Sequence, residues 1–177
     1  MAFHEQSVEV LLSAEQIQKR IVELGAQITK DYQGKELTLV GIMKGSIFFL
    51  TDLARQIDLP ITLELMGLSS YQGGTETTGE VRITSDLSKP MHGRHLLIVE
   101  DIIDTGLTMK FLLENLGARH PASVKVATLL EKPSRAKVKV NIDYKGFVIE
   151  DRFVVGYGLD YGEKYRNIPF VGVLRTD

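Results

Sequence analysis

The sequence contains no cysteine, which excludes disulfides, thiolate chemistry and cysteine-ligated zinc. Its four histidines show no metal-ligand spacing, so any bound metal is expected to be a hard ion with oxygen ligands. No apolar run approaches the roughly 20 residues that a membrane helix needs. The N-terminal residues also lack the basic-then-apolar pattern of a signal peptide. We therefore expect a soluble cytoplasmic protein that makes no contact with a membrane.

The chain also lacks a basic block and an acidic tail. Its 21 lysines and arginines are nearly balanced by 23 acidic residues, and the two signs are interspersed along the sequence. Nucleic acid is therefore not an expected partner. The 177 residues, of which 44% are hydrophobic, suffice for one domain with a proper core and are too few for two domains of ordinary size. We expect a single domain over residues 1–177.

Apolar residues alternate between helical and strand-like spacing along the chain. Ser13 to Gln16 form a capping box, and apolar residues then recur at helical spacing until Gly34. Two further helices are expected at 47–57 and from Met109 onwards. Short apolar runs bounded by turn residues predict strands at 37–42, 61–68, 80–87, 95–102, 124–130, 153–159 and 170–174. This alternation predicts an α/β fold with a mainly parallel, twisted sheet flanked by helices.

The stretch VEDIIDTGLTM, residues 99–109, combines acids with an anion-binding turn. In a sheet of this kind ligands bind beyond the carboxyl ends of the strands, where this stretch is expected. Glu100 and Asp101 offer acceptor oxygens that suit vicinal hydroxyls or a hydrated divalent cation. Backbone N–H groups, a glycine and two hydroxyls can cradle a phosphate in the turn formed by Thr105, Gly106, Leu107 and Thr108. Phosphoribosyl pyrophosphate carries a diol and a metal-bound pyrophosphate that suit the acids, and a phosphate that suits the turn.

Two other interpretations of this stretch are weaker. Ordinary helix-capping acids would explain single Asp and Thr residues, but not the full order of apolar strand, Glu-Asp, two aliphatic residues and Asp-Thr-Gly-x-Thr. A Walker B strand fails because no G-x-x-x-x-G-K-[ST] occurs in the chain. Gly156, Gly158 and Gly162 do not match the dinucleotide-binding fingerprint either. The full order resembles the signature of the phosphoribosyltransferases.

Nearly the whole chain resembles the bacterial hypoxanthine-guanine phosphoribosyltransferases, with four further motifs in the family's order. The resemblance implies the type I phosphoribosyltransferase fold, with a small hood built from the terminal segments. It also implies purine salvage, in which Mg2+ assists transfer of phosphoribose to hypoxanthine or guanine to form IMP or GMP. GIMKGS resembles the family's pyrophosphate loop, which implies a cis peptide between Met43 and Lys44 with Gly45 beside it. Ser70 and Tyr71 match the family's mobile loop over the reaction centre.

The last two motifs are similar to the parts of the family that bind the base and the leaving group. Lys132, in LLEKPS, matches the lysine that contacts the 6-oxo group of the purine. In FVVGYGLDYGEKYR the resemblance implies that Phe153 stacks on the purine and that the backbone of Val154 binds its edge. It further implies that Asp160 helps to hold magnesium and that Arg166 contacts pyrophosphate.

The resemblance also assigns the acids of residues 99–109. It places Asp104 near purine N7, as a general base or as a group that stabilises the proton there. Glu100 and Asp101 would anchor the ribose hydroxyls and are candidate magnesium ligands. Leu107 stands where some relatives carry lysine, so one phosphate-facing charge is missing while the backbone cradle is unaffected. Members of the family commonly form dimers or tetramers, so we expect a homo-oligomer.

Two alternatives remain at this stage. A regulator that senses phosphoribosyl pyrophosphate and binds nucleic acid on the same fold would need a basic face or an added helix-turn-helix segment. The near-neutral charge and the limited length argue against it. A phosphoribosyltransferase that prefers xanthine stays open, because hypoxanthine, guanine and xanthine share the 6-oxo group and differ at C2.

Overall fold

The structure, a computed structural model, describes residues 8–70 and 81–175. Six strands form the main sheet in the order β4-β3-β2-β5-β6-β7, and three form a smaller sheet in the order β1-β9-β8. The strands of the main sheet are β2 (Leu37–Met43), β3 (Ile61–Ser70), β4 (Val81–Ser85), β5 (His95–Ile103), β6 (Ser123–Glu131) and β7 (Tyr144–Val148). Those of the smaller sheet are β1 (Val8–Leu12), β8 (Val154–Val155) and β9 (Val171–Leu174). The helices are α2 (Ala14–Asp31), α3 (Ile47–Gln56), α4 (Leu107–Gly117) and the 3-10 turn η1 (Pro133–Arg135).

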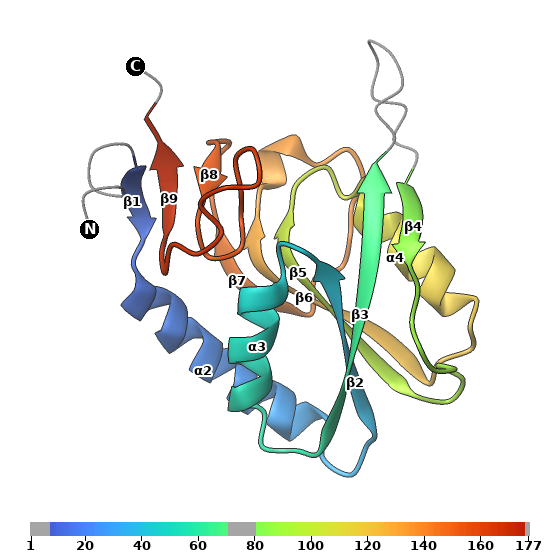
Figure 1. Cartoon of the computed structure of the whole chain (residues 1–177). Helices are drawn as coiled ribbons and strands as arrows, with labels where there is room; N and C mark the ends of the chain where they lie inside the picture. Colours follow the sequence, from blue (N-terminus) through green and yellow to red (C-terminus); the bar gives the residue numbers. More distant parts are fainter. Residues whose placement is uncertain (1–7, 71–80, 176–177) are drawn as a thin grey trace.

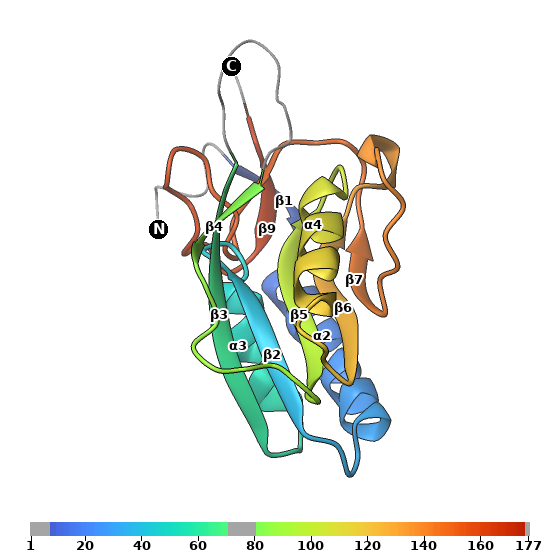
Figure 2. The same cartoon turned by 90° about the vertical axis from the view of Figure 1, so that its right-hand side faces the viewer.

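The main sheet is parallel except for β4, which pairs antiparallel with β3 at one edge. Helices α2 and α3 cover one face and α4 covers the other (Figures 1 and 2). The central strands β2 and β5 are therefore apolar on both faces, as strands enclosed by helices must be. The predicted α/β fold with a mainly parallel sheet is confirmed. The carboxyl ends of β2 and β5 lie at the same edge, and the loops that follow them lie next to each other.

Helix α2 begins where the sequence predicts. The Ser13 hydroxyl accepts from the backbone N–H of Gln16 (3.2 Å), and the Gln16 side chain accepts from the Ser13 N–H (2.9 Å), so the capping box is confirmed. One side of the helix is buried against α3 and the sheet through Ile17, Ile21, Leu24 and Ile28. No helix among residues 8–70 and 81–175 is long and apolar enough to cross a membrane.

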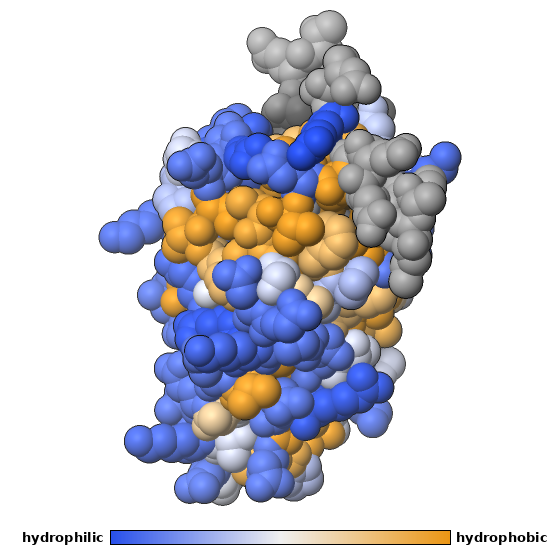
Figure 3. All heavy atoms as spheres, turned by 90° about the vertical axis from the view of Figure 1, so that its left-hand side faces the viewer, coloured by the Kyte–Doolittle hydropathy of each residue, from blue (hydrophilic) through white to orange (hydrophobic). Residues whose placement is uncertain are grey.

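The smaller sheet is the predicted hood, and it joins the two ends of the described chain. Strand β1 runs antiparallel to β9, with Val8 opposite Leu174. In Figure 3 a band of apolar residues crosses the upper part of the face on which β1 and β9 lie, above the largely hydrophilic outer surface of α2. A hydrogen bond ties the segment after β8 to the helices, because the hydroxyl of buried Tyr157 donates to Asp52 on α3 (2.5 Å). Gln18 on α2 donates to the same carboxylate (3.0 Å).

The structure corrects the predicted strand at 153–159. Only Val154 and Val155 form a strand, because the backbone turns at Gly156, Tyr157 and Gly158, whose φ angles are +95°, +50° and +100°. A positive φ is incompatible with a strand and favours glycine. Strands β1 and β7 were not predicted from the sequence. The predicted strand at 80–87 is shorter, Val81–Ser85.

Candidate active site

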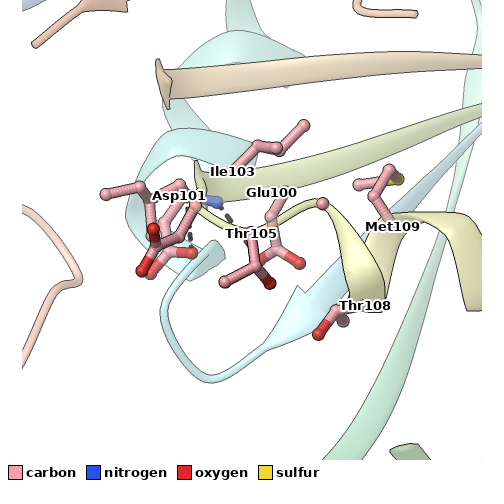
Figure 4. Close-up of a pocket in the computed structure, with 9 residues that line it drawn as sticks. Glu100, Asp101, Ile103, Thr105, Thr108 and Met109 are labelled. Carbon is pink, nitrogen blue, oxygen red and sulfur yellow. Dashed lines mark hydrogen bonds between the residues drawn. The ribbon is translucent and has the colours of Figure 1, made fainter. Parts of the chain in front are cut away.

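A hollow of about 180 Å3 lies where β5 ends and α4 begins, lined by residues 100–106, Thr108 and Met109. These are the residues of the sequence motif, and they occupy the carboxyl edge of the sheet as predicted. In Figure 4 Glu100 and Asp101 lie at the end of β5, Thr105 lies in the turn beside them, and Thr108 lies on the first turn of α4. The acids and the anion-binding turn therefore share one hollow.

The turn at Gly106 is held from behind by the segment that follows η1. The carbonyl oxygen of Thr105 accepts from the N–H groups of Lys137 (2.9 Å) and Val138 (3.1 Å). Gly106 has φ +81°, and a Cβ there would lie 2.5 Å from the carbonyl oxygen of Val138, so only glycine fits. The first N–H groups of α4 have no intrahelical partners and can bind an anion. Leu107 is half-buried in the first turn and adds no charge.

Glu100 and Asp101 form an acid pair in a poorly solvated position. Glu100 is only 8% exposed, and burial together with the negative charge of Asp101 raises its pKa well above the ordinary value. Burial also raises the pKa of Asp101, although hydrogen bonds from Glu100 and from the Ile102 N–H (2.8 Å), together with the charge of Arg166, oppose that rise. Adjacent buried carboxylates favour a bound cation or hydroxyl donors.

Glu100→Gln is expected to raise thermal stability at neutral and alkaline pH. In the wild type the buried carboxylate destabilises the fold progressively as pH rises from the ordinary glutamate pKa to the raised one, because the folded state holds its proton longer. The variant loses this penalty, and each kcal/mol gained raises the melting temperature by about 2–4 °C for a chain of this size. The difference between the melting temperatures of variant and wild type should therefore increase as the pH rises above the ordinary glutamate pKa of about 4.3.

Glu114→Gln, at an exposed position of α4, is the matched control, and its melting temperature should follow that of the wild type. A Glu100→Gln variant that is less stable than the wild type at neutral pH would contradict the prediction.

The loop between β2 and α3 packs directly against the acid pair. The predicted cis peptide between Met43 and Lys44 is confirmed. A Cβ on Gly45 would lie 1.8 Å from the Asp101 carboxylate, and a Cβ on Gly158 would lie 2.0 Å from the carbonyl oxygen of Gly45. Three segments distant in sequence therefore meet at contacts that admit no side chain.

The predicted pyrophosphate contacts lie beside this loop. The Lys44 ammonium lies 2.8 Å from Glu163. The guanidinium of Arg166 donates to the carbonyl oxygen of Gly158 (2.7 Å) and pairs with Asp160 (3.0 Å) and with Glu163 (3.4 Å). Lys44 and Arg166, predicted from separate motifs, are thus joined through one acid.

A second hollow of about 420 Å3 adjoins the first and shares Asp101 and Asp104 with it. It is lined by Asp101, Ile102, Asp104, Lys132, Arg135, Phe153, Val154, Leu159 and Asp160. Lys132 is 7% exposed, so it is not the solvent-exposed lysine that its short motif alone would suggest. Phe153 lines this hollow and is 55% exposed, which rules out a simple core role. The aromatic ring, the buried cation and Asp104 are suited to a flat heterocycle with an acceptor group.

Three polar residues of the site were not predicted from the sequence. Arg135 and Asp151 lie beside Asp104 and Lys132, and Glu163 lies between Lys44 and Arg166. Two features of the sequence could have indicated them. Arg135 follows Lys132 by three residues, and Glu163 lies between Asp160 and Arg166. Ser70 ends β3, and Tyr71 lies outside the described residues, so the role of their loop stays a prediction.

Comparison with known proteins shows to which family the chain belongs. The model of the phosphoribosyl transferase domain matches residues 7–162. The chain belongs to the phosphoribosyltransferase family. A hypoxanthine-guanine phosphoribosyltransferase of Staphylococcus aureus is 50% identical over 174 residues, which cover 98% of this chain and 97% of the relative. One from Streptococcus pneumoniae is 50% identical over 169 residues, covering 96% and 94%.

Solved structures agree with this assignment. The crystal structure of a hypoxanthine phosphoribosyltransferase from S. aureus superposes with a TM-score of 0.94 at 50% identity, covering 99% of this chain and 95% of that one. The resemblance inferred from the motifs is confirmed. The phosphoribosyltransferase fold predicted from them, with its terminal hood, is confirmed as well.

The predicted magnesium ligands of this phosphoribosyltransferase fit a hydrated cation. No group of three or more metal-ligating side chains is preassembled among residues 8–70 and 81–175. Glu100, Asp101 and Asp160 nevertheless line the two adjoining hollows with carboxylate oxygens. Magnesium is commonly held by one or two carboxylates, several waters and substrate phosphates, so a site completed by the substrate is consistent with these donors.

Glu163→Gln is expected to strengthen binding of magnesium pyrophosphate to the phosphoribosyltransferase. The Glu163 carboxylate pairs with both predicted pyrophosphate cations, and the hydrogen bond and charge of Lys44 lower its pKa. A bound pyrophosphate must displace this internal anion. Both partners are largely exposed, so the gain should be modest, about two- to fivefold in the dissociation constant by calorimetry.

Glu36, an exposed acid just before β2, provides the charge-matched control, and Glu36→Gln should leave the dissociation constant unchanged. Weaker binding of pyrophosphate to Glu163→Gln would mean that Glu163 organises the cations and does not compete for them.

Proposed function

We propose that the protein is a purine-salvage enzyme that transfers the 5-phosphoribosyl group from phosphoribosyl pyrophosphate to hypoxanthine or guanine. The products are IMP or GMP and pyrophosphate. The observation that carries this proposal is the junction of the two hollows. Asp101 and Asp104 line both the hollow with the anion-binding turn and the hollow with the aromatic ring and buried lysine. A phosphorylated sugar and a purine bound side by side would meet at these two acids.

Each part of the site has a defined task in this reaction. The turn at residues 105–108 binds the 5′-phosphate, and Glu100 and Asp101 bind the ribose hydroxyls, which together fix the anomeric carbon beside the base. Lys132 donates to the 6-oxo group, Phe153 stacks on the ring and the Val154 backbone binds its edge. Purine N9 attacks the anomeric carbon as the bond to pyrophosphate breaks, and Asp104 takes or stabilises the proton at N7.

Lys44, the Gly45 loop and Arg166 receive the pyrophosphate as it leaves. Magnesium held by Asp160 with Glu100 or Asp101 would neutralise charge that develops on this leaving group. Remote binding of the phosphate and the pyrophosphate contributes to orientation at the reacting carbon.

The direct test is an assay with phosphoribosyl pyrophosphate and each 6-oxopurine in turn, with magnesium and with excess chelator. Formation of IMP or GMP that stops in chelator supports the proposal. Failure to convert any 6-oxopurine would contradict it. The same assay decides whether xanthine is preferred, because the C2 substituent is the only difference among the three bases. A nucleic-acid-binding regulator has no support in the described surface, and the cytoplasmic location and single-domain organisation stay predictions from the sequence.

We further infer that the enzyme is a homo-oligomer that uses an apolar surface beside the pyrophosphate loop. Met43 at the end of β2, Ile47 and Phe48 on the first turn of α3, and Leu63 and Leu65 on β3 are all at least 36% exposed. Large apolar side chains gathered on adjoining elements are typical of protein interfaces. Leu63→Asp is expected to yield a smaller species by light scattering, while Val22→Asp on the outer face of α2 should not. An unchanged mass for Leu63→Asp would place the interface elsewhere.

A further inference from the structure

Four charged side chains form an alternating series along the base side of the site. Asp104 lies 2.8 Å from Arg135, Arg135 lies 3.5 Å from Asp151, and Asp151 lies 3.7 Å from Lys132. Two of these residues, Asp104 and Lys132, are the groups proposed to bind the purine at N7 and at the 6-oxo group. The other two have no assigned task. Arg135 lies in the base hollow, at the end of η1, and Asp151 lies just before Phe153.

The contact between Arg135 and Asp104 is an ion pair without hydrogen-bond geometry. Arg135 Nε is close to Asp104 Oδ1, yet this buried oxygen accepts no hydrogen bond from any of the described residues. A buried carboxylate oxygen with a charge nearby and no donor is incompletely satisfied. A donor on a bound base would complete it.

Arg135 has a second acid within reach. Its Nη1 lies 3.5 Å from Asp151 Oδ1, and Asp151 is about as exposed as Arg135 itself, so the guanidinium can turn towards it with little change in solvation. The Nζ atom of Lys132 approaches the same Asp151 oxygen. When a purine acceptor attracts Lys132, that oxygen becomes available to Arg135.

We propose that Arg135 is a positioning residue that holds Asp104 while the base hollow is empty and turns to Asp151 when a purine enters. The purine draws Lys132 towards its 6-oxo group and offers a proton near N7 to Asp104. Asp151 accepts the released guanidinium. The entering base therefore exchanges ion pairs within the site, and no charge is left without a partner. The inference rests on the proposed function, because it takes Asp104 and Lys132 as the groups that contact the base.

The test is a double-mutant cycle on the full-length enzyme, with steady-state kinetics in hypoxanthine and in phosphoribosyl pyrophosphate. In Asp151→Asn, Asp104 is the one acid among the described residues that still pairs with Arg135, so an entering base must break that pair and Arg135 gains no other partner in exchange. KM for hypoxanthine should rise about tenfold, within the usual range for directly coupled charges. Arg135→Gln alone should not raise it. In Asp151→Asn combined with Arg135→Gln, KM for hypoxanthine should fall by about threefold or more from the value of the single Asp151 variant.

Lys132 loses Asp151 in both Asp151 variants, so the comparison between those two reports on Arg135 alone. KM for phosphoribosyl pyrophosphate should be unchanged throughout, which a general loss of structure would not allow. Arg152→Gln, which removes a neighbouring exposed arginine, should behave as the wild type. Asp151→Ser is a second variant if the asparagine form melts at a lower temperature.

The outcomes separate the two proposals. A double variant whose KM for hypoxanthine equals or exceeds that of Asp151→Asn overturns the exchange of ion pairs, and so does an Asp151→Asn enzyme with wild-type kinetics. A wild-type protein that forms no nucleotide overturns the proposed function instead.

Discussion

Asp104→Asn is expected to lower turnover by about two to four orders of magnitude, the usual loss for a general acid–base group. Asparagine keeps the size of the side chain and loses the charge and basicity needed beside purine N7. Asp104 lines both hollows, and its Oδ1 atom is buried without a hydrogen-bond donor among the described residues. A proton acceptor is therefore in place before the base binds. Single-turnover kinetics measure the chemical step directly, and calorimetry with phosphoribosyl pyrophosphate shows whether binding is kept.

Asp86→Asn is a suitable control for this substitution. Asp86 is a charged side chain paired with Arg119 (2.8 Å) on the surface, away from the residues that line the two hollows. Its turnover should match that of the wild type. Wild-type turnover in Asp104→Asn as well would remove Asp104 from the mechanism.

Gly45→Ala is expected to reduce kcat/KM by about a hundredfold or more, because displacing a catalytic group by about 1 Å can cost that much. The added methyl carbon would lie 1.8 Å from the Asp101 carboxylate, a separation that no relaxed contact allows. Either the acid or the pyrophosphate loop must move. The loss of stability should be smaller than the loss of activity, because a shift of the loop away from Asp101 relieves the steric overlap. Activity assays and thermal denaturation of the same preparation distinguish the two effects.

Gly117→Ala provides the matched control at the end of α4. A Cβ at Gly117 meets no atom within 4 Å, so the same chemical change should leave activity intact. If Gly45→Ala retains wild-type kcat/KM, the loop is more adaptable than its packing indicates, and the predicted role of Asp101 beside it would need revision.

The parts of the site that the sequence predicted are those encoded by contiguous residues. The turn at 105–108 follows a buried strand directly, so its residue types and its place in the fold are read from one stretch. The capping box of α2 is equally local, and it was predicted to the residue. Glycine-rich backbone after β8 escaped prediction, because apolar residues with strand-like spacing outweighed the turn signal of Gly156 and Gly158.

Contacts between segments that are distant in the chain could not be predicted from the sequence. The approach of Gly45 to Asp101 depends on how β2 and β5 are aligned, and nothing in either segment specifies that distance. Arg135 was missed for the same reason, since it lies in η1 while its partner Asp104 follows β5. The family resemblance supplied roles for single residues, whereas the ion pairs between them required the three-dimensional arrangement.

The place of β9 in the smaller sheet, between β1 and β8, has a consequence for the order in which the protein folds during translation. The main sheet and its helices are complete once β7 has emerged, but β8 has no partner until β9 is synthesised. Phe153 directly precedes β8 and Val154 begins it, so the platform for the base depends on residues that are synthesised after the main sheet. A nascent chain arrested after residue 150 would therefore carry a folded phosphate cradle and no place for a purine.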